Sequence, residues 1–433
     1  MAKRKKKINP RVLLVICVLG VIVAGLLVAL IIQRLPQDPT TYTKRVEAEV
    51  AKDKPDWDQA FRDLGKAINY SDDKAAADLL LRQAELRFDR IQRQPNMSRS
   101  IQDEQRSLGW SSLQRAIRKD PNHLKARQML TELFEAVARA NPNASKAWLE
   151  YIDELNGLLA LDSKNARTYY RRGYAYAHLS DTEPMYKQKA AADFRKAAEL
   201  DPTNDAYWNM LANFLAATDK PTEAEQAFRE AIKANPNKAV LRINYASFLR
   251  RRDRLEEAQK LIQEAIQCEP SSPLGYIAQA GEYILKKQYA QAEETLNKAL
   301  AIDKTDTRVY RQLVLLYKLQ GKTDDATKAL RDGLAALEEE DAKGEKNNIT
   351  VRQRGQARAM LNYMLADILL DMYPATEDED ARKKLLEEAK SRHEVLVTLS
   401  PHQPQRYGIA GRIAYDEGKW VQSRENLEKI VDY

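Results

Sequence analysis

Residues 205–306 repeat one pattern three times at a spacing of 34 residues, and this repetition constrains the fold more than any other feature. Counting Asp205, Ala239 and Pro273 as position 1, we find alanine at positions 8, 20 and 27 and a large apolar residue at position 24. The alanines are Ala212, Ala246, Ala280, Ala224, Ala258, Ala292, Ala231, Ala265 and Ala299, and the large residues are Phe228, Ile262 and Leu296. A unit this short cannot bury its own apolar face, so neighbouring units must stack on one another.

Each unit reads as two short amphipathic helices joined by a polar turn, such as residues 218–221. The alanines mark places where two helix backbones approach closely, and the large residues fill the space beside them. Pro236 and Pro270 follow the second helices of the first two units, where a proline ends a helix because it lacks the N–H and clashes with the preceding turn. The low content of glycine (15 residues) and of aromatic residues (7%) also favours helices over sheets.

In length and pattern these units resemble the tetratricopeptide repeat. The resemblance implies an all-α, right-handed solenoid of about nine helix pairs and a partial one. Weaker copies of the pattern extend the predicted solenoid over residues 41–433, with the most regular repeats at 166–337 and an incomplete final repeat. Gln94–Ser100 and Glu338–Asn348 are expected to be loops between repeats.

The N-terminal residues predict a membrane anchor. Residues 1–11 form a basic tail, and residues 12–32 contain no charged or strongly polar side chain. As a helix, the second segment would span about 30 Å, the thickness of a bilayer's hydrocarbon core. The tail is expected in the cytoplasm, and the linker at 33–40 and the solenoid on the other side of the membrane. A cleaved signal peptide is the alternative, but no small-residue cleavage site precedes Gln33.

Charge and chemistry-bearing residues argue against nucleic-acid binding and catalysis. The seven lysines and arginines of residues 1–34 account for the whole formal charge of +7, so the rest of the chain is neutral. Cys17 and Cys268 are far apart in sequence, and the four histidines are scattered without metal-ligand spacing. No nucleophile elbow or phosphate-binding glycine loop is present. The sequence therefore predicts no enzyme activity, no metal and no cofactor.

The resemblance further implies a binding surface. In this family, the first helix of each unit lines an inner groove through positions 2, 5, 6, 9, 12 and 13. On this chain the predicted groove residues are Arg167, Tyr170, Tyr174, Asn209, Asn213, Asn244, Ser247, Arg250, Arg251, Arg308, Arg311 and Lys318. We expect Asn213 and Asn244 to bracket an extended peptide without contributing to the solenoid itself. The alternative is that these residues are ordinary exposed residues of a scaffold that binds elsewhere.

One receptor type within the family does not fit. Receptors for chaperone tails hold a terminal carboxylate with lysine and arginine at positions that carry Asn209, Leu274 and Ala278 here. The cationic half of that clamp is therefore missing from these repeats.

Together these features predict a membrane-anchored, non-enzymatic scaffold that binds a protein or peptide in the groove and a lipid bilayer through residues 12–32. Resemblance to bacterial anchored repeat proteins suggests the inner membrane and periplasm, and a part in envelope assembly, secretion or export. The alternatives are an organelle-surface import receptor, or the N-terminal part of an enzyme whose catalytic domain lies beyond residue 433. The uncapped C-terminal end predicts a further domain or an oligomer contact there.

Overall fold

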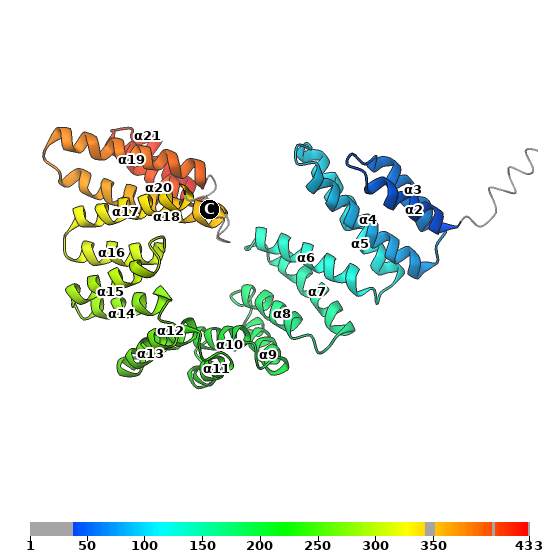
Figure 1. Cartoon of the computed structure of the whole chain (residues 1–433), viewed down its shortest axis with the longest axis horizontal. Helices are drawn as coiled ribbons and strands as arrows, with labels where there is room; N and C mark the ends of the chain where they lie inside the picture. The colour runs from blue at the N-terminus through cyan, green and yellow to red at the C-terminus, as the bar shows by residue number, and fades with distance from the viewer. Residues whose placement is uncertain (1–37, 343–350, 401–402, 432–433) are drawn as a thin grey trace, which may run out of the picture. The chain divides into compact units, whose positions relative to one another are not determined.

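The computed structural model describes residues 38–342, 351–400 and 403–431. In these ranges, twenty α-helices form ten successive antiparallel pairs (Figure 1). The prediction of an all-α solenoid of helix pairs is confirmed. The chain divides into two compact units, residues 1–200 and 201–433.

The described part of the first unit contains four helix pairs. They are α2 (Pro39–Val50) and α3 (Trp57–Asn69), α4 (Asp73–Arg93) and α5 (Arg99–Lys119), α6 (Leu124–Ala140) and α7 (Ser145–Leu161), and α8 (Ala166–His178) and α9 (Pro184–Leu200).

The second unit holds six pairs within its described residues. They are α10 (Asp205–Ala217) and α11 (Pro221–Ala234), α12 (Ala239–Arg250) and α13 (Leu255–Cys268), α14 (Pro273–Leu285) and α15 (Tyr289–Ile302), α16 (Thr307–Leu319) and α17 (Thr323–Ala342), α18 (Val351–Met372) and α19 (Glu379–Leu399), and α20 (Gln405–Asp416) and α21 (Trp420–Val431). A short 3-10 turn, η1 (Tyr373–Ala375), follows α18.

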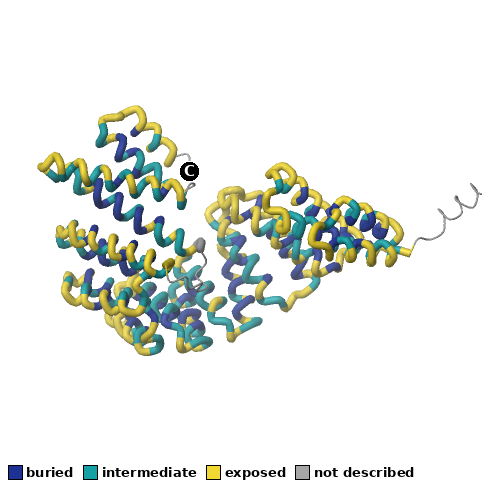
Figure 2. The backbone as a smooth tube through the Cα atoms, turned by 45° about the horizontal axis from the view of Figure 1, so that its top comes forward, coloured by how far each residue is buried: buried dark blue, intermediate teal, exposed yellow. Residues whose placement is uncertain are grey.

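The alanines of the repeat pattern lie where the helices meet. All nine are at most 2% exposed, and Phe228, Ile262 and Leu296 fill the space beside them. Figure 2 shows buried positions along the helix faces that meet, with exposed residues at the turns and helix ends. In the preceding repeat this small residue is Gly173, where a Cβ would lie 2.9 Å from the Phe194 ring. The register inferred from the sequence is therefore the register of the core.

The turn inside each regular repeat has one recurring geometry. Asp219, Asp253, Lys287 and Gly321, spaced by 34 residues, all have positive φ, between 56° and 72°. The next residue donates its backbone N–H to the carbonyl five residues back, as in Lys220 N to Leu215 O at 2.9 Å. This is the hydrogen bond of the Schellman motif, which ends a helix and reverses the chain. A left-handed residue thus ends the first helix at the same position in each of these four repeats.

A side chain at position 4 closes the connection to the preceding repeat. The indole N–H of Trp208 donates to the Pro202 carbonyl at 3.1 Å, and the Arg242 guanidinium to the Pro236 carbonyl at 2.6 Å. In the next such repeat the hydroxyl of Tyr310 takes this role. These bonds give a partner to carbonyl groups of the connections that follow α9, α11 and α15.

Two predicted loops are shorter than expected. Helix α5 begins at Arg99 and uses the Ser98 hydroxyl as its N-cap, so the loop at Gln94–Ser100 is wrong for its last residues. Helix α17 continues through Ala342, so Glu338–Ala342 are helical rather than part of a loop. Glutamate and alanine are good helix formers, and a helix already in progress adds residues at little cost.

The predicted tail and membrane helix of residues 1–32 lie outside the described residues, as does most of the linker at 33–40. In the part of the chain that the structure describes, no helix combines the length and the apolar character needed to cross a bilayer.

Candidate protein-binding surface

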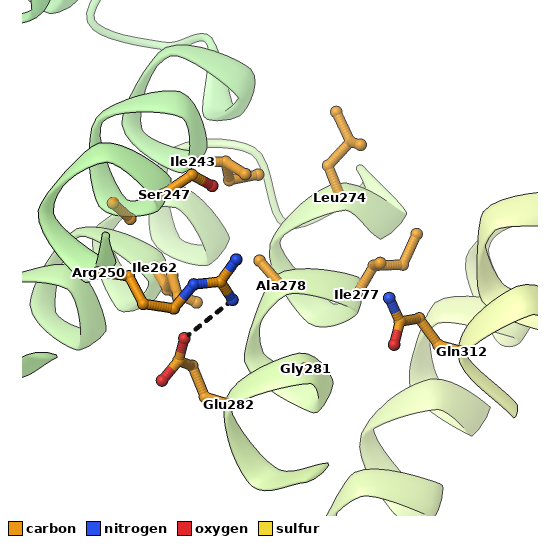
Figure 3. A pocket seen from close by; sticks show the side chains of 11 residues that line it. Ile243, Ser247, Arg250, Ile262, Leu274, Ile277, Ala278, Gly281, Glu282 and Gln312 are labelled. Atoms are coloured by element: carbon orange, nitrogen blue, oxygen red, sulfur yellow. Dashed lines mark hydrogen bonds and ion pairs between the residues drawn. The ribbon is translucent and has the colours of Figure 1, made fainter. Parts of the chain in front are cut away.

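A pocket of about 200 Å³ opens on the first helices of the second unit (Figure 3). It lies between α12 and α14, and α13 and α16 each contribute one residue. The lining residues are Ile243, Ala246, Ser247, Arg250, Ile262, Leu274, Ile277, Ala278, Gly281, Glu282 and Gln312. Apart from Ile262, which is on a second helix, and the buried alanine Ala246, these residues occupy positions 2, 5, 6, 9, 10 and 12 of their repeats.

The pocket exists because small and large residues alternate across the two helices. Ala278 and Gly281 on α14 leave space where the neighbouring positions carry longer side chains. Ile243, Leu274 and Ile277 stand around that space and are half-buried, while Ile262 closes its floor at 5% exposed. The result is a mainly apolar hollow, wide enough for one aliphatic or aromatic side chain.

An ion pair lies at the edge of this pocket. Arg250 reaches from α12 toward Glu282 on α14, with 3.5 Å between Nη1 and Oε1 (Figure 3). The Glu282 side chain is only 9% exposed, whereas that of Arg250 is 42% exposed. A buried carboxylate needs a cation nearby, so Arg250 is partly committed to the fold and presents its other donors to solvent.

One asparagine pair joins α10 to α12, and a third asparagine bonds within α10. Asn244 Nδ2 donates across to Asn209 Oδ1 at 3.0 Å, and Asn213 Nδ2 donates to the Asn209 carbonyl oxygen of its own helix at 2.9 Å. The expectation that Asn213 and Asn244 contribute nothing to the solenoid is therefore wrong, because both amides bond to the fold. Within the described residues, the Oδ1 atoms of Asn213 and Asn244 accept no hydrogen bond and remain available to a ligand.

Lys318 is part of a charge cluster across three first helices. Its Nζ lies 2.8 Å from Asp371 Oδ2, and Arg412 Nη2 lies 2.8 Å from the other oxygen of that carboxylate. Arg412 Nη1 also contacts Asp367 at 2.5 Å. Burial alone would raise the pKa of Asp371, but Lys318 and Arg412 outweigh it and hold that pKa below its usual range. Lys318 thus connects α16 to α18, where Arg412 of α20 holds the same carboxylates, and does not stand free in a groove.

The remaining predicted residues of the second unit differ in how free they are. Arg308 forms two short contacts with Asp306, the N-cap of its own helix, at 2.9 Å from Nε and 2.6 Å from Nη2. Arg251 and Arg311 are exposed, and no carboxylate of the described residues forms an ion pair with either. Ser247 lines the pocket.

In the first unit, the predicted residues lie on α8. Arg167 is exposed and Tyr170 is half-buried. The ring of Tyr174 packs edge-on against His178 at 4.8 Å, and the Arg139 guanidinium lies 4.9 Å from its centre. His178 stacks on Trp148, and burial, followed by the charge of Arg139, lowers the pKa of the imidazole. This cluster is packed aromatic surface without a pocket of its own in the described residues.

Sequence reasoning missed the apolar side of the second unit's surface. Ile243 and Ile277 occupy position 5, where the regular repeats before and after them carry Asn209 and Arg311. Leu285, Leu315 and Leu319 occupy positions 9 and 13 and are all exposed. Reading every residue at these positions, instead of only the polar ones, would have found them.

No group of histidine, cysteine and carboxylate side chains suited to a metal ion occurs among the residues that the structure describes.

Comparison with known families agrees with the repeat geometry. Patterns described as tetratricopeptide repeat match residues 194–226, 215–280 and 275–306. Residues 194–306 of the chain therefore contain tetratricopeptide repeats. Members of this family are protein-interaction scaffolds, and no catalytic domain is evident in the described part of this tetratricopeptide-repeat protein.

Solved structures similar to this tetratricopeptide-repeat protein are distant in sequence. Yeast Tom70 is 19% identical, with 81% of this chain and 68% of that chain covered and a TM-score of 0.41. A tetratricopeptide repeat protein from Parabacteroides merdae is 15% identical, with 66% and 99% covered and a TM-score of 0.42. PilF of Pseudomonas aeruginosa is 20% identical, with 57% and 96% covered and a TM-score of 0.34. No curated protein matches the chain in sequence.

Proposed function

We propose that this tetratricopeptide-repeat protein is a membrane-anchored scaffold that binds a protein partner on the first helices α10, α12, α14 and α16. We call this region the first-helix surface and define it by the residues at positions 2, 5, 6, 9, 10, 12 and 13 of those helices. The observation that carries the proposal is the pocket between α12 and α14, an apolar hollow on the face that the repeat family uses for binding.

The energetics require more than the pocket alone. Burying one leucine-sized side chain contributes about 1.5–3 kcal/mol, which is too little for stable association. The free Oδ1 atoms of Asn213 and Asn244 supply acceptors for backbone N–H groups of an extended segment. An extended peptide that places one apolar side chain in the pocket and its backbone beside these amides uses both features.

The membrane part of the proposal rests on the sequence. The apolar run at 12–32 and the basic tail before it support a single-pass anchor, with the repeats outside the cytoplasm. A bacterial inner membrane, with the repeats in the periplasm, and a part in envelope assembly, secretion or export are the setting we propose.

The binding surface is tested by site-specific photo-crosslinking of the full chain in its native membrane. A photoreactive amino acid at Ser247, in the pocket, is compared with one at Lys260, on the second helix α13. We expect a partner band from Ser247 that is lost when Ala278→Phe fills the pocket and when Leu274→Ser removes one of its walls. Melting curves of both variants check that the fold is intact. Crosslinks from Lys260 alone would show that the outer helices bind instead.

Topology is tested separately by reporter fusion. A reporter fused after Tyr433 is expected to be active only outside the cytoplasm, with a fusion after Arg11 as the opposite control. Activity of the first fusion in the cytoplasm, or recovery of a mature chain that begins near Leu35, would overturn the proposed anchor.

A further inference from the structure

Three leucines on neighbouring first helices are exposed and lie close to one another in the repeat pattern. Leu285 on α14 is 64% exposed, and Leu315 and Leu319 on α16 are 46% and 53% exposed. Leu315 and Leu319 are one helical turn apart, so they lie on one side of α16. Leu285 holds on α14 the same repeat position that Leu319 holds on α16, and α14 packs against α16. We call these three residues the leucine strip.

The leucine strip continues from the pocket. Gly281 lines the pocket and precedes Leu285 by one helical turn on the same side of α14. A partner side chain in the pocket therefore has apolar surface beside it along the first helices. Exposed apolar residues grouped next to a hollow are characteristic of interaction sites rather than of ordinary surface.

Around this apolar area, the carboxylates have cationic partners, whereas two arginines form no ion pair within the described part of the chain. Glu282 of the first-helix surface is paired with Arg250, and two carboxylates next to that surface are also paired: Asp306 with Arg308, and Asp371 of α18 with Lys318 and Arg412. Two cations are not. Arg251 makes only a contact from Nε to the Ser247 carbonyl of its own helix at 3.3 Å, and Arg311 forms no ion pair with any described residue.

Position in the repeat places these two arginines beside the apolar area. Arg251 is at position 13 of α12, the position that Leu285 and Leu319 hold on α14 and α16. Arg311 is at position 5 of α16, the position that Ile277 of the pocket holds on α14. The free charge of this surface is therefore positive, and it flanks the pocket and the leucine strip.

We infer that the partner of the first-helix surface is an acidic, apolar linear segment of a protein. It presents apolar side chains to the pocket and the leucine strip, and carboxylates to Arg251 and Arg311. Charge complementarity carries this choice, because an acidic segment pairs the two free cations, whereas a basic segment would add like charge beside them. The inference rests on the proposed function and specifies the chemistry of its partner.

The test uses the full chain in detergent micelles as bait for a phage-displayed library of random peptides of about 12 residues, which span about 40 Å when extended. We expect the selected sequences to combine Asp or Glu with Leu, Ile or Phe. A synthetic peptide from this set should bind several-fold more weakly at about 500 mM than at about 50 mM salt. Selection of basic or uncharged sequences would overturn the inference.

Paired variants then assign the effect to the named residues. Arg251→Glu combined with Arg311→Glu should lower the affinity for the selected acidic peptide by about tenfold or more and shift selection toward basic sequences. Leu285→Ser combined with Leu319→Ser should weaken it by a similar factor without changing the salt dependence. The matched control, Lys260→Glu with Lys298→Glu, alters exposed lysines of second helices and should leave binding unchanged.

Further outcomes separate the two proposals. If Ala278→Phe abolishes peptide binding while the double arginine variant binds normally, the first-helix surface is a binding site but the partner is not chosen by its acidity. The proposed function itself is overturned if Ala278→Phe leaves peptide binding unchanged. It is also overturned if the wild-type chain and the Ala278→Phe variant select the same peptides. If anionic lipid added to the micelles displaces the peptide only when Arg251 and Arg311 are present, a membrane surface is the occupant instead.

Discussion

The regular repeats and the long outer pairs begin their helices in different ways. In the regular run α10–α15, the N-cap residues of the second helices are Lys220, Arg254 and Gln288, and none of their side chains caps the helix. The N-cap residues of the longer helices α4, α5 and α19 are Asp72, Ser98 and Asp378, whose side chains accept a backbone N–H from the first turn.

This difference follows from the turns that precede the helices. In the regular run, a left-handed residue reverses the chain within a few residues, and the cap residue's own backbone N–H bonds back to the first helix. That turn keeps the connection between the two helices the same in each regular repeat. The helices with a side-chain cap differ more in length: α4, α5 and α19 each have 21 residues, whereas α3 and α8 have 13.

The largest expected effect concerns the close helix contacts of the regular run. Ala258 is fully buried where α13 meets its neighbours, so Ala258→Leu should lower the free energy of unfolding by about 1–3 kcal/mol through overpacking. Lys260→Gln, two residues away on the exposed side, should change it by less than about 0.5 kcal/mol. Urea denaturation followed by circular dichroism measures both. Equal stabilities would mean that the contact is looser than its burial indicates.

Replacing the N-cap residue should lower stability more in a helix with a side-chain cap than in a helix without one. Asp72 accepts the Ala75 N–H at 2.8 Å, so Asp72→Ala should cost about 1 kcal/mol of stability. Lys220→Ala, at the same place on a regular second helix, removes no capping bond and should cost a few tenths of a kcal/mol at most, roughly the worth of an exposed ion pair. The comparison fails if the two substitutions prove equally costly in the same denaturation assay.

A third substitution tests the left-handed turn directly. Lys287 has φ of 59°, a conformation that a side chain disfavours, so Lys287→Gly should stabilise the protein by up to about 1 kcal/mol. Its neighbour Lys286 has φ of −81°, and Lys286→Gly should instead destabilise by about 0.5–1 kcal/mol. Thermal melting of the two variants should therefore shift in opposite directions. A shift in the same direction would show that the turn is not strained at Lys287.

The smallest expected effect is a dependence on pH that is specific to the regular run. Glu225 on α11 bonds to Arg254 and also to Tyr245 and Arg229, which lowers its pKa to about 2. Since the folded pKa lies below the unfolded value of 4.5, this stabilisation is present above pH 4.5 and is lost as the pH falls toward 2. The group is partly exposed, so solvent screens it and the contribution should be about 0.5 kcal/mol.

This dependence is measured as the difference in stability between wild type and Glu225→Gln. The difference should be present at neutral pH and shrink as the carboxylate of the wild type is protonated. A difference that stays constant between pH 7 and pH 3 would contradict the lowered pKa. Glu223→Gln, on the same helix, serves as a comparison with a second carboxylate.

Two of the residues predicted from the sequence, Ser247 and Arg250, line the pocket between α12 and α14. Whether the predicted residues bind a partner stays a prediction. The prediction from the sequence selected polar residues and missed Ile277 and Leu315, because an apolar residue in a helical pattern usually belongs to the core.

The sequence alone determined the helix pairs, their register and the alanine contacts. These features depend on residues close together in the chain or repeated at one period, so the pattern that specifies them is visible without a structure. Side-chain size at positions 8, 20 and 27 sets how closely the helices approach, and that choice recurs in every regular repeat.

Only the tertiary structure decided which polar residues are free. Asn244 reaches Asn209 across 35 residues of sequence, and Lys318 reaches Asp371 across 53. These pairings depend on how far each side chain extends between stacked repeats, which no local pattern encodes. The open pocket arises in the same way, since it is the space left where Ala278 and Gly281 on α14 face Ile243 on α12.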